Sequence, residues 1–194
     1  MPLLRESIKQ EELEFWRYLY STSDFNAVRK QDYIEKLGFF VPEIITQEGL
    51  GIDLGCGLMS IWDFYEGKNK KIFAIDPLMT SYNRIHRNKT ASVAGDGEYL
   101  PIKDNSLDWI FCVNVLDHTS NPKLLVSEIQ RTLKPNGTLY LEVHFDDRLG
   151  SAHYMLWNDG VIDKHLADFK LVRSNKLRLN KTCQTLYTGI YKNG

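Results

Sequence analysis

The sequence predicts an α/β protein with three layers, in which a mostly parallel sheet lies between helices on both faces. From Leu50 onward, short apolar segments of strand composition alternate with segments of helical period, a pattern typical of parallel strands joined by crossover helices. The first apolar segment runs directly into a glycine pair, Gly55 and Gly57. The chain closes with two strand-like segments separated by a polar turn, and such a hairpin would add an antiparallel edge to the sheet.

The part of the chain before this alternating pattern is predicted to be helical. Apolar side chains recur at helical spacing over 11–20, which indicates an amphipathic helix. Polar residues at 21–24 offer N-capping side chains for a second helix over about 25–37. We expect a single domain, in which 1–48 forms a helical lid or cap on a core of 49–194.

Seven strands are expected in the core, each ending near a turn or loop signal. The predicted strands are 50–54, 71–76, 91–95, 108–114, 138–145, 171–179 and 184–191. The predicted helices are 58–65, 78–87, 122–133 and 159–169. Asn121 followed by Pro122 marks the start of the third of these helices, because asparagine caps helix starts and proline suits the first helical position.

Composition and charge restrict the class of function. The chain has 194 residues, 43% of them apolar, and a formal charge of −1, so a basic surface for nucleic acid is not expected. Three cysteines without metal-ligand spacing favour a reducing, cytoplasmic setting and no metal site. No apolar run approaches the roughly 20 residues that span a bilayer, and the N-terminus lacks the apolar core of a signal peptide.

Polar residues fall at the carboxyl ends of four successive predicted strands, namely Asp53, Asp76, Asp96 and Asn114. Ligands of open α/β sheets bind outside these strand ends. Asp76 comes 19 residues after Gly57 (76 − 57 = 19), about the spacing at which an acid binds ribose hydroxyls. A carboxylate beside a glycine loop favours a cationic or amine-bearing ligand over phosphate. Any one of these residues could be an ordinary cap or turn, but the set indicates a nucleoside cofactor site.

From Gly51 to Leu141 the sequence resembles the class I S-adenosylmethionine-dependent methyltransferases, most of all the methyltransferase-11 type. The matching segments are Asp-Leu-Gly-Cys-Gly, Ala-Ile-Asp-Pro, Gly-Asp-Gly-Glu-Tyr-Leu-Pro, Asn-Ser-Leu-Asp-Trp-Ile-Phe, Val-Leu-Asp-His and Glu-Ile-Gln-Arg-Thr-Leu-Lys-Pro-Asn-Gly-Thr-Leu. The resemblance implies a Rossmann-like fold that ends in an antiparallel hairpin. It also implies S-adenosyl-L-methionine as cofactor and S-adenosyl-L-homocysteine as product.

The resemblance further implies roles for single residues near the first two strands. Asp53, Gly55 and Gly57 would hold the methionine portion of the cofactor. Asp76 would bind the ribose hydroxyls, and Leu78 would pack on the adenine. Neighbouring positions expected in the same site are Cys56, Pro77 and Glu98. Cys56, between the glycines, is expected to be a loop spacer rather than a nucleophile, since nothing in the sequence lowers its pKa.

The next two strand ends would complete this cofactor site. Asp96 would accept a hydrogen bond from the adenine amino group, and the Gly97 amide would face a ring nitrogen. Asn114 and Val115 would lie beneath the methionine and the sulfonium. His118 matches a histidine that is frequent in the family near the path of methyl transfer.

The expected reaction is O- or N-methylation of a small-molecule or sugar-like acceptor by in-line displacement. A sulfonium methyl is already activated, so the main task is to hold the acceptor in line. A hydroxyl acceptor also needs a general base, for which His118, His144, Asp146 and His153 are candidates; each has an ordinary loop-stabilising role as its alternative. The polar and aromatic loop over 144–157 suits a sugar-like acceptor. Lipid-like molecules, and then protein or RNA, are the next acceptor classes.

Two other functions, and the placement of the N-terminal residues, stay open at this point. A nicotinamide-dependent oxidoreductase shares the glycine loop, but its third glycine is replaced here by Ser60. A non-catalytic cofactor-binding scaffold or partner subunit would keep the same cofactor residues. In the N-terminal helices, Arg17, Tyr20 or Tyr33 could face the pocket, although core packing explains the aromatic residues there equally well.

Overall fold

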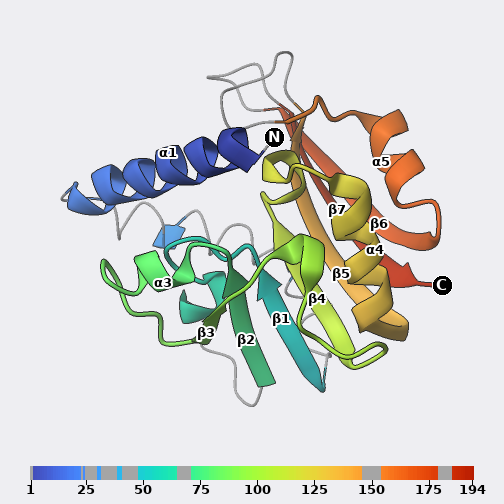
Figure 1. Cartoon of the computed structure of the whole chain (residues 1–194). Helices are drawn as coiled ribbons and strands as arrows, with labels where there is room; N and C mark the ends of the chain where they lie inside the picture. The colour runs from blue at the N-terminus through green and yellow to red at the C-terminus, as the bar shows by residue number, and fades with distance from the viewer. Residues whose placement is uncertain are drawn as a thin grey trace.

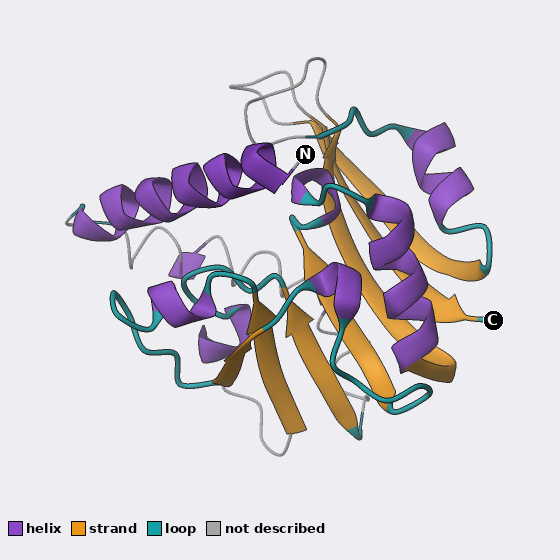
Figure 2. Ribbon diagram, viewed as in Figure 1, coloured by secondary structure: helices purple, strands orange, loops and turns teal. Residues whose placement is uncertain are grey.

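The chain forms one seven-stranded sheet with helices on both faces (Figures 1 and 2). The computed structural model describes residues 2–22, 24, 30–31, 39–40, 48–64, 71–145, 154–178 and 185–194. The strands are β1 (Leu50–Leu54), β2 (Lys71–Asp76), β3 (Ala91–Ala94), β4 (Leu107–Val113), β5 (Leu133–Phe145), β6 (Phe169–Arg178) and β7 (Thr185–Asn193). The helical elements are α1 (Pro2–Ser21), η1 (Ile61–Phe64), α3 (Met79–Tyr82), η2 (Gly97–Tyr99), η3 (Leu116–His118), α4 (Pro122–Thr132) and α5 (Asp159–His165).

The strand order is β3-β2-β1-β4-β5-β7-β6. Strands β1 to β5 are parallel, and β7 runs antiparallel to both of its neighbours, β5 and β6. The predicted three-layer, mostly parallel sheet with a C-terminal antiparallel hairpin is therefore confirmed. The order reverses between β1 and β4, and the crevice at such a switch point is where open α/β sheets bind ligands.

Strand β4 shows why both faces of the sheet are covered. Ile110 and Cys112 point to one face and belong to a core cluster that includes Leu125 of α4. The alternate residues Trp109 and Phe111 point to the other face, where Phe111 meets Phe40 edge-on at 5.0 Å between ring centroids. All four strand residues are buried, as expected for a strand between two helical layers.

Helix α4 begins where the sequence predicts. The Asn121 side chain accepts a hydrogen bond from the Leu124 backbone N–H at 3.2 Å, and Pro122 occupies the first turn. The buried residues Leu125, Val126 and Ile129 hold this helix against the sheet.

Several elements differ in length from the predictions. The helix predicted over 58–65 is only the single 3₁₀ turn η1, because the Ser60 side chain bonds to Asp53 and accepts the Trp62 backbone N–H. The helix predicted over 78–87 ends at Tyr82. Beyond it, the backbone N–H groups of Arg84 and Ile85 donate to carbonyl oxygens three residues earlier, as in a 3₁₀ turn. Helix α5 ends at His165, and β5 begins at Leu133 because Leu133 pairs with Leu107.

The N-terminal helix is longer than predicted, spanning Pro2–Ser21. The helix predicted over 25–37 lies outside the described residues, apart from 30–31, which are helical. Within the described part of the chain, no helix is both long enough and apolar enough to cross a bilayer.

Candidate active site

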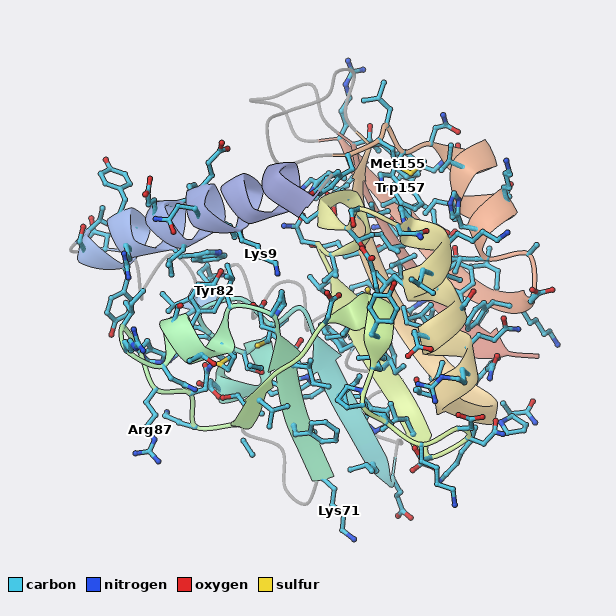
Figure 3. All side chains as sticks on the ribbon, in the orientation of Figure 1. Lys9, Lys71, Tyr82, Arg87, Met155 and Trp157 are labelled. Carbon is cyan, nitrogen blue, oxygen red and sulfur yellow. The ribbon has the colours of Figure 1, made fainter. Side chains whose placement is uncertain are left out.

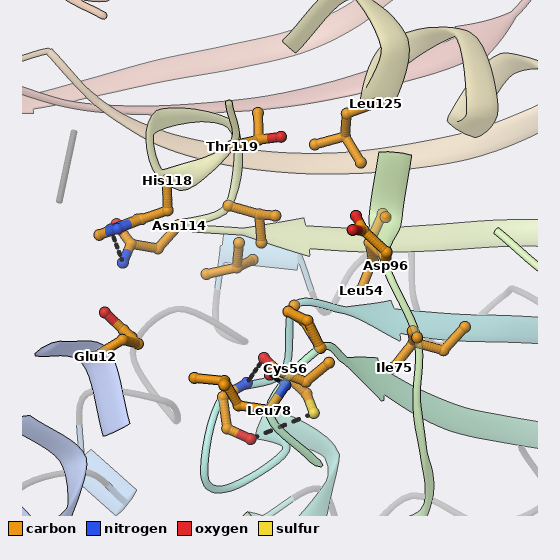
Figure 4. A pocket seen from close by; sticks show the side chains of 18 of the residues that line it. Glu12, Leu54, Cys56, Ile75, Leu78, Asp96, Asn114, His118, Thr119 and Leu125 are labelled. Atoms are coloured by element: carbon orange, nitrogen blue, oxygen red, sulfur yellow. Dashed lines mark hydrogen bonds between the residues drawn. The ribbon is translucent and has the colours of Figure 1, made fainter. Parts of the chain in front are cut away.

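A cavity of about 510 Å³ opens at the carboxyl ends of β1, β2 and β4 (Figure 4). Every position that the sequence predicts to bind the cofactor lines this cavity: Asp53, Gly55, Cys56, Gly57, Asp76, Pro77, Leu78, Asp96, Gly97, Glu98, Asn114, Val115 and His118. Of the candidate bases, His118 and His144 line it as well. Asp146 and His153 lie outside the described residues.

The loop after β1 needs glycine at both predicted positions. Gly55 and Gly57 have φ values of +67° and +64°, in the left-handed region that other residues rarely adopt. A Cβ at Gly55 would lie 2.5 Å from Cγ2 of Val115. The Gly55 backbone N–H donates to Ile75 O at 2.7 Å, which ties the loop to the end of β2.

Two buried carboxylates lie beside this loop. Asp53 accepts the Ser60 hydroxyl at 2.5 Å, and burial raises the pKa of Asp53 to about 7. Asp76 accepts the backbone N–H groups of Gly57 at 3.0 Å and Leu78 at 2.8 Å, and burial raises its pKa to about 6. Both shifts have the same cause, because burial disfavours the charged form of a carboxyl group. A bound cation would offset that cost.

The turn after β3 is organised by two acids with different partners. Asp96 caps η2 by accepting the Glu98 backbone N–H at 3.0 Å. Glu98 is buried, and its Oε1 accepts hydrogen bonds from Thr119 Oγ1, Ser120 Oγ and Asn121 N at 2.8, 2.8 and 3.0 Å. Glu98 therefore joins η2 to the start of α4 as well as lining the cavity.

A polar cluster lies at the end of β4, on the far side of the cavity from the glycine loop (Figure 4). Asn114 has a φ of +58°, rare for a residue with a side chain. Its Nδ2 lies 3.2 Å from His118 Nε2, and its Oδ1 lies 2.6 Å from His144 Nδ1. Asp117 Oδ2 is 3.4 Å from the same nitrogen of His144. The side-chain amide of Asn114 therefore contacts both candidate bases, His118 and His144.

Helix α1 contributes residues that sequence reasoning missed. Lys9, Glu12 and Trp16 line the cavity, and Glu12 Oε1 accepts the Trp16 indole N–H at 2.6 Å. Figure 3 shows Lys9 pointing from α1 toward the sheet. These positions share one face of the helix with the predicted core residue Leu13, so the amphipathic stripe was the available signal.

Arg17 and Tyr20, two of the three N-terminal residues suggested for the pocket, do not line the cavity. Arg17 is exposed and is not among the residues that line the cavity. Tyr20 packs instead on His86, with its hydroxyl 3.2 Å from His86 Nδ1. Tyr33 lies outside the described residues. Arg17 points away from the face that carries residues 9, 12 and 16, whereas Tyr20 lies one turn beyond Trp16 on that face and contacts His86.

Burial also settles the chemistry of Cys56. It is a buried residue whose pKa is raised well above the usual range by burial and by the nearby Asp53 charge. A thiol in that state is a poor nucleophile. Among the described residues, His, Cys, Asp and Glu side chains form no group of three that could hold a metal ion.

The residues present fit a nucleoside cofactor that carries positive charge. The volume falls in the range of roughly 300–1,000 Å³ that small-molecule sites occupy. The glycine loop brings backbone to the cavity wall, and two acids with raised pKa values line it. The fold and this site define an α/β protein with a cavity of the size of a nucleoside cofactor at the switch point of its sheet.

Comparison with known proteins agrees with that class. A family model described as a methyltransferase domain matches residues 52–141. An uncharacterised protein of Methanocaldococcus jannaschii is 29% identical over 168 residues, covering 75% of this chain and 72% of that protein. Thiol S-methyltransferase TMT1B of Rattus norvegicus is 30% identical over 129 residues, covering 60% of this chain. The chain spans only 52% of that enzyme's length.

A solved structure extends the similarity to the whole fold. Magnesium protoporphyrin IX methyltransferase from Synechocystis, with bound S-adenosylhomocysteine, superposes with a TM-score of 0.70 at 14% identity, covering 100% of this chain and 99% of that one. The chain is therefore similar to methyltransferase domains in sequence over residues 52–141, and it shares the fold of a methyltransferase along its whole length.

Proposed function

We propose that this chain is an S-adenosyl-L-methionine-dependent methyltransferase that methylates oxygen or nitrogen of a small-molecule or sugar-like acceptor in the cytoplasm. One observation supports the proposal most strongly. A single cavity of about 510 Å³ is lined both by the glycine loop and by His118 and His144. Donor and acceptor would therefore occupy one continuous space, with the polar cluster at the acceptor end.

The glycine-loop side would hold the methionine portion and the ribose. Asp53, Gly55 and Gly57 would contact the methionine portion, and Asp76 would accept hydrogen bonds from the ribose hydroxyls. When bound, S-adenosylmethionine supplies a methyl group already activated by its positively charged sulfur. Two acids in a buried wall suit such a ligand, because a cation restores the favourable interactions that burial removed.

The rest of the cavity lining would hold the adenine and the sulfur end of the cofactor. Leu78 would pack on the adenine, while Asp96 and Gly97 would meet its polar edge. Asn114 and Val115 would lie beneath the sulfur end. The left-handed backbone of Asn114 supports this placement, since strained conformations gather at functional sites.

The remaining tasks of the chain are to orient the acceptor and to receive its proton. Orientation is worth up to roughly 7–11 kcal/mol in favourable cases, and a positioned base contributes about 10²–10⁴-fold. His118 and His144 are the described candidates for that base, and Asp146 stays a candidate from the sequence. The helical lid that we propose for 1–48 would help to exclude water, because Trp16 and Glu12 of α1 already line the cavity.

The relatives leave the acceptor atom open, since one named relative is a thiol S-methyltransferase. The formal charge of −1 favours a small molecule over RNA as acceptor. An acceptor screen should therefore include hydroxyl, amine and thiol compounds. Product mass spectra would identify the methylated atom.

Titration calorimetry tests the cofactor half of the proposal. We expect heat with S-adenosylmethionine and with S-adenosylhomocysteine, and none with NADH. Transfer of a labelled methyl group into a cell extract tests the catalytic half. Labelled product supports the proposal, whereas binding without any labelled product would favour a non-catalytic scaffold or partner subunit, the alternative that the sequence leaves open.

A further inference from the structure

Four polar side chains form a connected row at the acceptor end of the cavity. His118 Nε2 lies 3.2 Å from Asn114 Nδ2, and Asn114 Oδ1 lies 2.6 Å from His144 Nδ1. Asp117 Oδ2 follows at 3.4 Å from that same Nδ1. Figure 4 shows the first of these contacts as a dashed line. The row brings β5 together with η3 and the residue that follows β4.

The row assigns the proton on His144. Both partners of Nδ1, the Asn114 carbonyl oxygen and the Asp117 carboxylate, are hydrogen-bond acceptors. Nδ1 must therefore carry the hydrogen, and in the neutral ring Nε2 is then the basic nitrogen. The Asn114 amide is a donor toward His118, so His118 Nε2 is the accepting nitrogen of that ring.

Asp117 is buried, and it contacts His144 and the backbone of Tyr154. Its side chain is 1% exposed, and its backbone carbonyl accepts the Tyr154 N–H at 3.2 Å. The His144 backbone N–H also points at Asp117 Oδ2, at 3.4 Å. A buried carboxylate is costly unless a partner offsets the cost, and the imidazole of His144 lies beside Asp117.

We propose that Asp117 is a positioning residue, which together with Asn114 holds His144 with Nδ1 protonated and Nε2 as the proton acceptor for the reaction. This inference rests on the proposed function and narrows its substrate class. In the step itself, the acceptor's X–H bond breaks and its proton bonds to Nε2. The electron pair stays on the heteroatom that takes the methyl group. The site is then suited to a hydroxyl, a thiol or a protonated amine, and gains nothing from a tertiary amine.

The charge added to His144 in that step would be met by Asp117 across Nδ1. The other titratable groups that line this cavity are Asp53, Asp76, Asp96, Glu98, Cys56, His118, Tyr82 and Tyr154, with Lys9 and Glu12 on α1. Asp117 is an acid in contact with His144 Nδ1. Removal of the Asp117 charge should therefore lower the pH at which the His144 ring titrates.

Nitrogen NMR of the chain labelled at its histidine rings tests the assignment without any acceptor. A His144→Gln variant identifies the signals of His144. We expect neutral His144 to show the Nδ1–H tautomer in the wild-type chain. The Nε2–H tautomer in the wild-type chain would overturn the proposal, and this measurement needs no variant that alters Asp117.

An Asp117→Asn variant supplies the second readout. We expect the proton affinity of His144 to fall by about tenfold or more, so that its ring titrates at lower pH, as loss of an opposite charge within ~4–6 Å predicts. His165, bonded through Nδ1 to Val161 O, and His86 are internal controls that should not move. A His144 titration identical to wild type in a folded Asp117→Asn chain would overturn the proposal.

Calorimetry with S-adenosylhomocysteine separates this inference from the proposed function. If the wild-type chain binds no cofactor, the proposed function fails whatever the histidine spectra show. If the chain binds cofactor and the spectra contradict the tautomer, only the role of Asp117 fails. We expect Asp117→Asn to bind S-adenosylhomocysteine within about threefold of wild type, because Asp117 is not among the residues that line the cavity.

Discussion

Trp16 of α1 lies against Gly57 of the loop that follows β1. A Cβ added to Gly57 would be 3.4 Å from Cζ2 of the indole ring, and the indole N–H is held by Glu12. The N-terminal helix and the glycine loop are thus in contact across 41 residues of sequence (57 − 16 = 41). Helix α1 crosses the carboxyl ends of the strands (Figure 1) and forms one wall of the cofactor cavity.

Replacement of Trp16 by alanine should weaken cofactor binding. We expect the Kd for S-adenosylhomocysteine to rise by about tenfold, equivalent to about 1.4 kcal/mol, because the side chain forms part of the cavity wall. Phe15→Ala is the matched control, since Phe15 is the adjacent residue and is 53% exposed. Calorimetry on both variants checks this. Equal losses in the two variants would show that the helix acts only through overall stability.

Replacement of Gly55 by alanine should damage both the fold and the site. The new Cβ would lie 2.5 Å from Val115 at a positive φ, so we expect a loss of about 1–3 kcal/mol in unfolding free energy. Binding of S-adenosylhomocysteine should weaken more than tenfold. Gly160→Ala is the control, because its Cβ would meet nothing closer than 3.5 Å. Thermal unfolding and calorimetry should leave that control unchanged or slightly more stable.

The raised pKa of Asp53 predicts a pH dependence of stability. The pKa is about 7 in the folded chain against an ordinary value of 3.8, so the folded state binds the proton more tightly. The stability that this group contributes is complete below about pH 4 and is lost as pH rises through 7. Relative to wild type, Asp53→Asn should gain about 2 kcal/mol between pH 5 and pH 8. Denaturant unfolding at both pH values measures this.

A surface carboxylate provides the control for that experiment. Asp168→Asn alters an exposed turn residue and should follow the wild-type pH profile within error. The prediction would fail if Asp53→Asn and wild type lost stability in parallel from pH 5 to pH 8.

The raised pKa values of Asp53 and Asp76 predict that a cationic cofactor releases protons from these two carboxyl groups when it binds. Burial raises the pKa of Asp53 to about 7 and that of Asp76 to about 6, so both carboxyl groups are partly protonated near pH 6. A sulfonium favours their charged forms, and S-adenosylhomocysteine lacks that charge. We expect the affinity for S-adenosylmethionine relative to S-adenosylhomocysteine to rise from pH 5 to pH 8. Calorimetry in two buffers of different ionisation enthalpy would measure the released protons, and a constant affinity ratio would contradict the prediction.

The parts of the site that could be predicted are those that belong to short, continuous sequence patterns. Asp53, Asp76 and Asp96 each end a short apolar run, so strand period alone places them at one edge of the sheet. The glycine loop is equally local, because its left-handed backbone demands glycine at fixed positions. For the same reason the start of α4 at Pro122 could be predicted from the sequence.

The parts that sequence reasoning missed depend on contacts between distant segments. Glu12 and Trp16 reach the cavity only because α1 lies across the sheet edge, and the apolar stripe of that helix does not reveal its partner. Asp117 and His144 are 27 residues apart, and no local pattern pairs them. Helix ends were also misjudged, since Ser60 bonds to Asp53 in place of starting a longer helix.

Strand β7 lies between β5 and β6, so β6 has its only described neighbour later in the chain than itself. During synthesis from the N-terminus, β6 therefore emerges before the strand that must separate it from β5. Strand β6, which carries the exposed apolar residues Leu171, Val172 and Leu177, has no strand to pair with until β7 is present. This edge of the sheet can therefore assemble only after Thr185–Asn193 is available to enter between β5 and β6.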